Sequence, residues 1–288
     1  MPPFRLVQVS DTHISRLRAY FHTNWEAFLE LMAEEKPDLI VHSGDLCLRG
    51  NVDEDDMLFG RAQLDRMPAP VAIIPGNHDI GDTPPDAKRG HPVTQELRDR
   101  WVGLFGPDRW SRDAGGWTII GLNAQIFDSG LPCEAEQWEW LEDALARASG
   151  RPVLVFCHKN LFAARPDEPE RSAAVLYPDS RHRLLDLFGR HDVRAVASGH
   201  NHVYRTLRHG GMELIWAPGT SFVHQLEKKG MEDGIRRSGY LRYTLDADRM
   251  THEFVEPPLL FTHDLTNWSR AHGTTVHLPE RPLHGMGG

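Results

Sequence analysis

The sequence predicts an α/β fold, and three observations support this prediction. Short apolar runs typical of strands alternate with amphipathic helical stretches as far as Ala197, an order typical of a largely parallel sheet with right-handed crossovers. After Ser198 the pattern changes to strands joined by Gly-containing turns, as in antiparallel hairpins. The 288 residues, of which 40% are hydrophobic and 25% charged, provide a substantial core. We therefore expect one domain in which sheet layers pack between helices.

The elements expected before residue 75 have the order β-α-β-α-β. In residues 24–34 the apolar side chains recur at helical spacing, so they would lie on one face of a helix. The predicted strands of this part are residues 4–9, 39–41 and 71–74, and the predicted helices are residues 24–34 and 53–66.

The second half continues this order and then ends in hairpins. The elements predicted up to residue 197 are strands at 118–122, 153–156 and 193–197 and helices at 134–148 and 181–190. The strands expected to be antiparallel are residues 203–207, 213–216, 240–244 and 251–255. Residues 257–288 show no clear periodicity, so we expect an irregular C-terminal tail that packs on a domain formed by residues 1–256.

The composition restricts the partners and the compartment. A formal charge of −9 repels a polyanion, so no nucleic-acid partner is expected, although bound metal ions would still attract a small phosphorylated substrate. The three cysteines are too few and too scattered for a disulfide framework. The N-terminus enters a strand pattern at once, and no apolar run approaches the roughly 18 residues of a membrane span. We expect a cytoplasmic protein.

Polar motifs follow five of the predicted strands directly. Because ligands bind beyond the carboxyl ends of strands in α/β sheets, we expect these motifs to converge. Each motif alone is typical of an ordinary turn, but five of them in order, each at the end of a strand, indicate a site. They are Asp11-Thr12-His13, Gly44-Asp45, Gly76-Asn77-His78-Asp79, Cys157-His158 and Gly199-His200-Asn201-His202.

The chemistry of these motifs indicates a metal site. Mixed carboxylate, amide and imidazole ligands suit Mn, Fe, Zn or Co better than they suit a structural zinc. Asp11 and His13 are two residues apart, and so are His200 and His202; in extended backbone such pairs point the same way and could bind ions together. The glycines before Asp45 and the other motif residues allow sharp turns and leave room for a ligand near the backbone.

The order of these motifs resembles the calcineurin-like metallophosphoesterase superfamily over roughly residues 4 to 225. The resemblance implies a four-layer αββα sandwich with two divalent metal ions at the strand ends. A shared carboxylate, Asp45, would offset the repulsion of two cations about 3.5–4 Å apart. The resemblance assigns one metal ion to Asp11, His13, Asp45 and His202, and the second to Asp45, Asn77, His158 and His200.

The resemblance also implies a mechanism, in which a hydroxide bridging the metal ions attacks phosphorus in line with the leaving alkoxide. His78 resembles a non-ligand histidine that protonates the leaving oxygen or stabilises charge on the phosphoryl group, and Asp79 could orient its imidazole and raise its pKa. Asn77 and His78 would contact the substrate. Arg49 lies four residues after Asp45, the spacing of a phosphate-binding arginine in phosphoprotein phosphatases, although a solvated turn arginine is an equal alternative.

One motif departs from the family pattern. Where the family usually has His-His-Pro, this chain has Cys157-His158-Lys159, which keeps the ligand and replaces its neighbours. Cys157 is interpreted as a packed thiol rather than a ligand. Lys159 could add positive charge at the mouth of the pocket or simply be solvated.

The expected activity is hydrolysis of a phosphodiester. The motifs look most like those of the bacterial class III cyclic-nucleotide and glycerophosphodiester phosphodiesterases, and a related branch acts on membrane glycerophospholipids, so the partner would be a small or lipid phosphodiester. Alternatives are a phosphomonoesterase such as a nucleotidase or protein phosphatase, a nuclease, and a non-catalytic binding module. We expect substrate specificity to depend on three loops beside the site, at residues 80–92, 159–177 and 221–234. The tail could contribute to a homo-oligomer.

Overall fold

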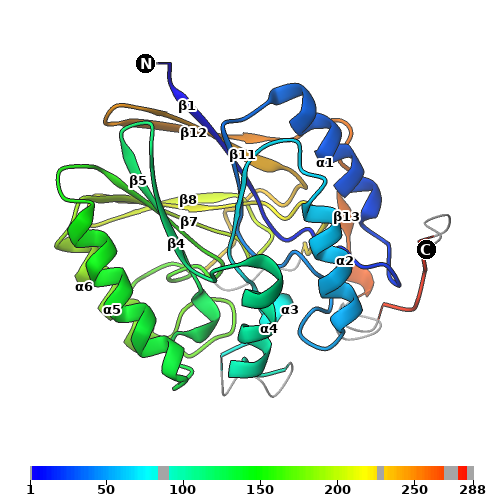
Figure 1. Ribbon diagram of the computed structural model, residues 1–288, viewed down its shortest axis with the longest axis horizontal. Helices are drawn as coiled ribbons and strands as arrows, with labels where there is room; N and C mark the ends of the chain where they lie inside the picture. The colour runs from blue at the N-terminus through cyan, green and yellow to red at the C-terminus, as the bar shows by residue number, and fades with distance from the viewer. Residues whose placement is uncertain (1, 84–90, 226–229, 269–277, 284–288) are drawn as a thin grey trace.

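Two β-sheets face each other at the centre of the molecule (Figure 1). The computed structural model describes residues 2–83, 91–225, 230–268 and 278–283. The first sheet has the order β12-β11-β1-β2-β3 and the second β4-β5-β6-β7-β9-β8. The first consists of β1 (Phe4–Val9), β2 (Leu39–His42), β3 (Val71–Ile73), β11 (Tyr240–Asp246) and β12 (Arg249–Val255). The second consists of β4 (Trp110–Ala114), β5 (Trp117–Leu122), β6 (Val153–Cys157), β7 (Val193–Ser198), β8 (Arg205–His209) and β9 (Met212–Trp216).

Helices cover the outer faces of both sheets, so the molecule has the predicted four αββα layers (Figure 1). One apolar cluster joins the first sheet to its helices, a second joins the other sheet to its helices, and a third fills the space between the sheets. The first sheet carries α1 (His22–Glu35), α2 (Glu54–Leu64), the short α3 (Asn77–Ile80) and α4 (Gln95–Phe105). The second carries α5 (Pro132–Arg147) and α6 (Pro178–Gly189), and a 3₁₀ turn, η2 (Ala124–Ile126), follows β5.

The central strands of both sheets are parallel, as the alternation of strands and helices predicted. β1, β2 and β3 pair in parallel, and so do β5, β6 and β7. Their residues are almost completely buried, because each sheet is covered on both faces. The carboxyl ends of these strands therefore open on the same side of the molecule, where the loops that carry the polar motifs begin.

The hairpins follow the prediction in part. The turn between β8 and β9 contains Gly210 and Gly211, both at positive φ. The turn between β11 and β12 has no glycine, and Ala247 adopts the left-handed conformation there instead. β9 is antiparallel to β8 but parallel to β7, so this strand extends the parallel sheet, which the hairpin pattern did not predict.

Segments after the second sheet and in the tail pair with each other. β10 (Phe222–Val223) and β13 (His263–Asp264) form a short parallel ladder outside the two main sheets. Leu260 and Leu278 of the tail are buried, and the backbone of Arg281 exchanges hydrogen bonds with residues 17 and 19. The structure thus shows that the described part of the tail contacts the body of the fold. No helix in the described ranges has the length and apolar character required to cross a bilayer.

Candidate metal centre

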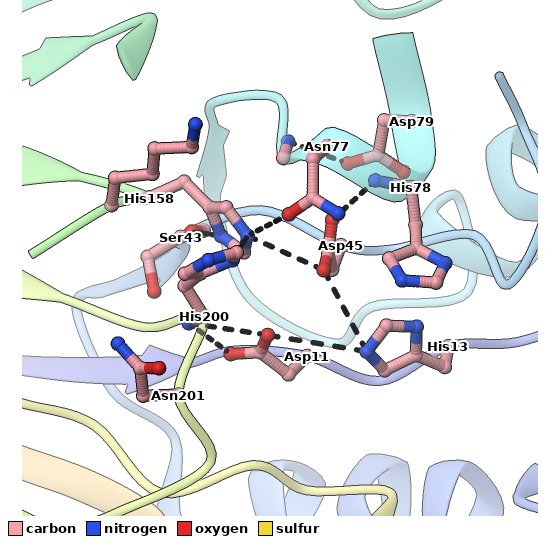
Figure 2. Close-up of polar contacts among 12 residues, drawn as sticks. Asp11, His13, Ser43, Asp45, Asn77, His78, Asp79, His158, His200 and Asn201 are labelled. Atoms are coloured by element: carbon pink, nitrogen blue, oxygen red, sulfur yellow. Dashed lines mark hydrogen bonds and ion pairs between the residues drawn. The ribbon is translucent and has the colours of Figure 1, made fainter. Parts of the chain in front are cut away.

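The five polar motifs meet at the carboxyl ends of β1, β2, β3, β6 and β7 (Figure 2). Ligand-type atoms within 4.8 Å of one another form three groups, and these groups share His13 and Asp45. The first sheet supplies Asp11, His13, Asp45 and Asn77, and the second supplies His158, His200 and His202. The groups are Asp11 with His13 and His202, His13 with Asp45 and His78, and Asp45 with His158 and His200.

The ligand loops use left-handed backbone rather than the extended backbone that we expected. Five candidate ligands have φ between 44° and 71°, a region that non-glycine residues adopt at a cost. The two-residue spacing therefore brings the side chains together through tight turns, not through the alternation of a strand. These residues are Asp11, His13, Asp45, His200 and His202.

The motif glycines are required for contact between neighbouring protein groups. A Cβ on Gly76 would overlap the Asp45 carboxylate, and one on Gly199 would overlap the side chains of Ser10 and Asp11. We had expected these glycines to make room for a ligand near the backbone. They instead allow the loop of one strand to pack directly on the ligands of the next.

Asp45 lies between the two sets of histidines. Its Oδ2 is 3.7 Å from His13 Nε2 and 3.3 Å from His158 Nε2 (Figure 2). Its Oδ1 accepts a hydrogen bond of 2.8 Å from the backbone N–H of His78. Asp11 lies beside a different histidine, because its Oδ1 is 3.3 Å from His202 Nε2. Asp45 therefore lies between imidazoles that come from both sheets.

Backbone carbonyls fix which nitrogen of each imidazole faces the centre. The Nδ1–H groups of His158 and His202 donate to Ser43 O at 2.9 Å and to Phe222 O at 2.6 Å. His200 has the opposite orientation, because its Nε2–H donates to Ala173 O at 2.8 Å. A carbonyl oxygen only accepts, so when the two rings are neutral, as metal binding requires, these bonds leave His158 Nε2 and His200 Nδ1 with lone pairs directed inward.

These lone pairs provide a test of whether the residues suit a metal ion. His158 Nε2 and His200 Nδ1 lie 3.2 Å apart. Two inward lone pairs at this distance repel each other unless a cation lies between or beside them. The carboxylates of Asp11 and Asp45 complete an oxygen and nitrogen donor set that suits divalent transition metals. The residues therefore fit metal ions.

The electrostatics keep both carboxylates ionised. Burial alone would raise their pKa values, but the imidazoles of His202 beside Asp11 and of His158 beside Asp45 outweigh it, so both pKa values are held well below the usual range. For His158, burial lowers the pKa, but the Asp45 carboxylate raises it further, to about 9. The centre thus attracts positive charge strongly.

Asn77 and His78 begin α3, directly after the β3 loop. The Oδ1 of Asn77 is 3.3 Å from His158 Nε2, which places the amide beside the second group of ligands. His78 directs its Nδ1–H to Leu48 O at 2.7 Å, and its ring meets the His13 ring edge-on at 4.6 Å. Its imidazole therefore borders the centre with Nε2 available for another partner.

Asp79 does not orient His78, which corrects one expectation. Its carboxylate accepts backbone hydrogen bonds from Gly76 at 2.8 Å, from Cys47 at 2.9 Å and from Leu46 at 3.3 Å. Within the described residues it forms no hydrogen bond with the His78 imidazole, which Leu48 O holds instead. Asp79 thus joins the β2 and β3 loops and acts on the centre through the backbone.

Three residues beside the candidate ligands, Arg49, Cys157 and Lys159, have different surroundings. No contact joins the Arg49 side chain to the candidate ligands in the described part of the chain, and its Nε is buried without a partner. Cys157 is a packed thiol, as expected, and burial raises its pKa to about 12. Lys159 was wrongly expected at the pocket mouth or in solvent. It is buried and forms an ion pair with Asp82.

Several supporting residues were not predicted. Phe222 packs its ring 4.2 Å from the His202 ring and 4.9 Å from the His13 ring. The Ser221 hydroxyl donates to Asp11 O at 2.6 Å. Most of these partners act through backbone carbonyls, as Ala173 does, and a carbonyl has no signature in the sequence. Of the three loops expected at the site, residues 84–90 and 226–229 lie outside the described residues.

Comparisons with known proteins agree with this geometry. A family model described as calcineurin-like phosphoesterase matches residues 4–204. The Danio rerio protein named serine/threonine-protein phosphatase CPPED1 is 30% identical over 244 residues, which cover 74% of each chain. The probable glycerophosphodiester phosphodiesterase GpdQ of Arcobacter nitrofigilis is 25% identical over 288 residues, which cover 94% of this chain and 91% of the relative.

Solved structures show the same fold at low sequence identity. A purple acid phosphatase from yellow lupin has a TM-score of 0.67 at 16% identity, covering 88% of this chain and 51% of its own. A dimetal phosphatase from Danio rerio has a TM-score of 0.58 at 15% identity, covering 88% and 96%. The motif order, the αββα layers and the family match lead to one conclusion: the chain belongs to the calcineurin-like phosphoesterase family.

Proposed function

We propose that this protein hydrolyses phosphodiesters with two divalent metal ions bound at the strand ends. The observation that supports the proposal best is the position of Asp45, whose Oδ2 lies between His13 and His158 and can serve both sets of ligands. One ion would be held by Asp11, His13, Asp45 and His202, and the other by Asp45, Asn77, His158 and His200. Mn, Fe, Zn and Co all suit these donors.

The chain's own residues account for the remaining steps. Bound divalent ions would supply positive charge to the phosphate oxygens and lower the pKa of water towards neutrality. When both of its ring nitrogens carry a proton, His78 would donate the Nε2 proton to the leaving oxygen, while Leu48 O accepts the Nδ1–H bond and fixes the ring. The Asn77 amide would bind a phosphate oxygen beside the His158 side of the centre. Asp79 would hold both loops in register.

A phosphomonoesterase is the second candidate. The similarity to a relative named as a serine/threonine-protein phosphatase, at 30% identity, favours it, whereas the similarity to the glycerophosphodiester phosphodiesterase extends over 94% of the chain and favours a diester. We prefer the diester because the motifs after β3 and β7 match that branch. Glycerophosphodiesters, cyclic nucleotides and glycerophospholipids are the substrates to compare.

Two assays test the proposal. Purified protein reconstituted with Mn²⁺, Co²⁺ or Zn²⁺ should hydrolyse bis-p-nitrophenyl phosphate faster than p-nitrophenyl phosphate, and a preference for the monoester by orders of magnitude would contradict the diesterase assignment. Asp45→Asn should abolish turnover of the preferred substrate, and full activity would refute the shared ligand. Arg49→Ala tests the arginine separately: a raised KM supports phosphate binding, and unchanged kinetics would exclude it.

A further inference from the structure

The amide of Gln8 is buried beside the apolar layer between the two sheets. Gln8 of β1 is completely buried and lies on the face of the strand that also carries Leu6, which belongs to the apolar cluster between the sheets. Burying an amide among apolar side chains is unfavourable unless its hydrogen bonds are satisfied. An apolar side chain would fill this position without that requirement. The identity of the partners of Gln8 is therefore informative.

The partners of Gln8 belong to both sheets. Its Nε2 donates to Ser43 Oγ at 2.8 Å, directly after β2, and to Ser198 O at 3.5 Å, at the end of β7. Its Oε1 accepts a hydrogen bond of 2.7 Å from the hydroxyl of Tyr243 in β11. The Nε2 group of Gln8 thus bonds to Ser43 of the first sheet and to Ser198 of the second sheet. The Oε1 atom bonds to Tyr243, which belongs to the first sheet.

Both contacts of Nε2 lead directly to the candidate metal ligands. Ser43 lies two residues before Asp45, and its carbonyl accepts the Nδ1–H of His158 (Figure 2). Ser198 lies two residues before His200. The sheets also touch at this level, because Gly199 packs against Ser10 with no room for a Cβ. The Gln8 amide therefore lies beneath the centre and joins the loops that carry ligands from opposite sheets.

We propose that Gln8 is a positioning residue that sets the distance between the two halves of the metal centre. The candidate metal ligands come from two sheets, and an apolar cluster fills the space between these sheets. Apolar packing is not directional, so it tolerates small sliding movements, whereas hydrogen bonds specify one register. The Nε2 bonds of Gln8 hold the Asp45 loop and the His200 loop together, and the Tyr243 hydroxyl satisfies the remaining amide oxygen.

A comparison of three variants tests this inference, which depends on the metal site proposed above. Gln8→Met keeps the volume and removes all three bonds. Tyr243→Phe is the matched control, because it removes the bond to Oε1 and leaves both Nε2 bonds to the ligand loops. Ser43→Ala removes the Oγ acceptor of Gln8 together with the 3.5 Å bond from that hydroxyl to Val9 O, so it provides a milder test if Gln8→Met does not fold. The probe is Co²⁺ titrated into the metal-free protein and followed by its visible absorption, and urea unfolding of the metal-free protein measures stability separately.

The variants should separate stability from metal affinity. We expect Gln8→Met and Tyr243→Phe both to lower the urea midpoint, since each leaves a buried polar group unpaired. Of these two variants, only Gln8→Met should weaken Co²⁺ binding, by about tenfold or more, as for other residues that orient ligands. Ser43→Ala should weaken binding by a smaller factor, and Tyr243→Phe should stay within about twofold of the parent.

Distinct results would overturn the two proposals. A parent protein that binds no Co²⁺ would refute the metal site and the role of Gln8 together. A parent that binds Co²⁺ normally, with unchanged affinity in Gln8→Met or in Ser43→Ala, would refute the role of Gln8 alone. Equal losses of affinity in Gln8→Met and Tyr243→Phe would refute it as well, because they would indicate general loosening of the core.

Discussion

Left-handed backbone at single residues is the main local cost of this site. A non-glycine residue loses about 1–2 kcal/mol in this conformation, and five candidate ligands adopt it. This conformation lets each loop direct a short side chain, such as that of Asp11 or Asp45, toward the other candidate ligands. Such strain persists only where surrounding contacts hold it. Here the contacts are specific: Ser221 bonds to Asp11 O, and the Asp79 carboxylate binds the backbone just beyond Asp45.

The role of His78 can be separated from general effects on the site by varying the leaving group. We expect His78→Gln to lower kcat by about 10²–10⁴-fold for diesters with alkyl leaving groups, which need a proton to depart. Loss of a p-nitrophenolate group should be affected much less, because this anion is stable unprotonated. The measurement is kcat across a series of leaving groups in parent and variant. The exposed His91 provides the control, His91→Gln. A uniform loss across the series would argue against proton donation.

The buried carboxyl group of Asp56 should make the stability of the fold depend on pH, and this effect does not involve the candidate metal ligands. It lies in the first turn of α2 and accepts a hydrogen bond from the Arg49 backbone, and burial raises its pKa from 3.8 to about 6. Because the folded-state pKa exceeds the unfolded one, the contribution of Asp56 is most favourable below pH 4 and is lost as the pH rises through about 6.

Asp56→Asn should remove this loss, which is of the order of 3 kcal/mol at most. The free energy of unfolding of the variant, measured in urea, should fall less between pH 4 and pH 7 than that of the parent. Asp55→Asn changes an exposed acid in the first turn of the same helix, and it should leave the pH dependence as it is. Identical pH profiles for Asp56→Asn and the parent would disprove the buried-acid interpretation.

At the scale of elements, the strands and helices with a strong apolar pattern were predicted from the sequence, whereas those with mainly exposed residues were not. Strands buried on both faces, such as β2 and β6, were predicted because they are continuous apolar runs. β4 was not predicted, since it is an edge strand whose middle residues are exposed. In α4 only Trp101 is buried, so the helix shows little apolar periodicity in a charged stretch. The ligands were predicted from their motifs, whereas the carbonyls that orient them could not be.

The segment around β10 and β13 depends on one buried side chain of α1. Asn24 donates to Thr220 O and to Phe261 O, both at 2.8 Å, and accepts from the N–H of Phe261 at 2.9 Å. Asn24→Ala should therefore release the tail, and the amide of Phe261 should exchange with deuterium at least about tenfold faster, which corresponds to about 1.4 kcal/mol of lost protection. Glu30→Ala, at an exposed position of the same helix, is the control. Unchanged exchange at Phe261 would show that the tail is held by its apolar contacts instead.

At the scale of the molecule, the candidate metal centre lies where the two sheets meet. Three of the seven candidate ligands come from loops of the second sheet and four from the first, while the layer between the sheets is mainly apolar. Ions bound there would join the layers in the way that a cross-link does. Their removal should therefore change the stability of the whole fold and not only the activity.

Removal of metal ions with a chelator should lower the melting temperature. A ligand that binds only the folded state adds about 2.7 kcal/mol per site to the free energy of unfolding when its concentration is a hundred times its Kd. In a domain of this size, each kcal/mol raises the melting temperature by about 2 °C or more. Dialysis against a chelator followed by Mn²⁺, Co²⁺ or Zn²⁺ should lower and then restore the melting temperature by several degrees, measured by scanning calorimetry. Asp45→Asn loses the shared carboxylate, so most of this response should disappear in that variant. If parent and variant respond equally to added metal, the ions stabilise the fold from some other position, and Asp45 is not the residue that links the two sheets through them.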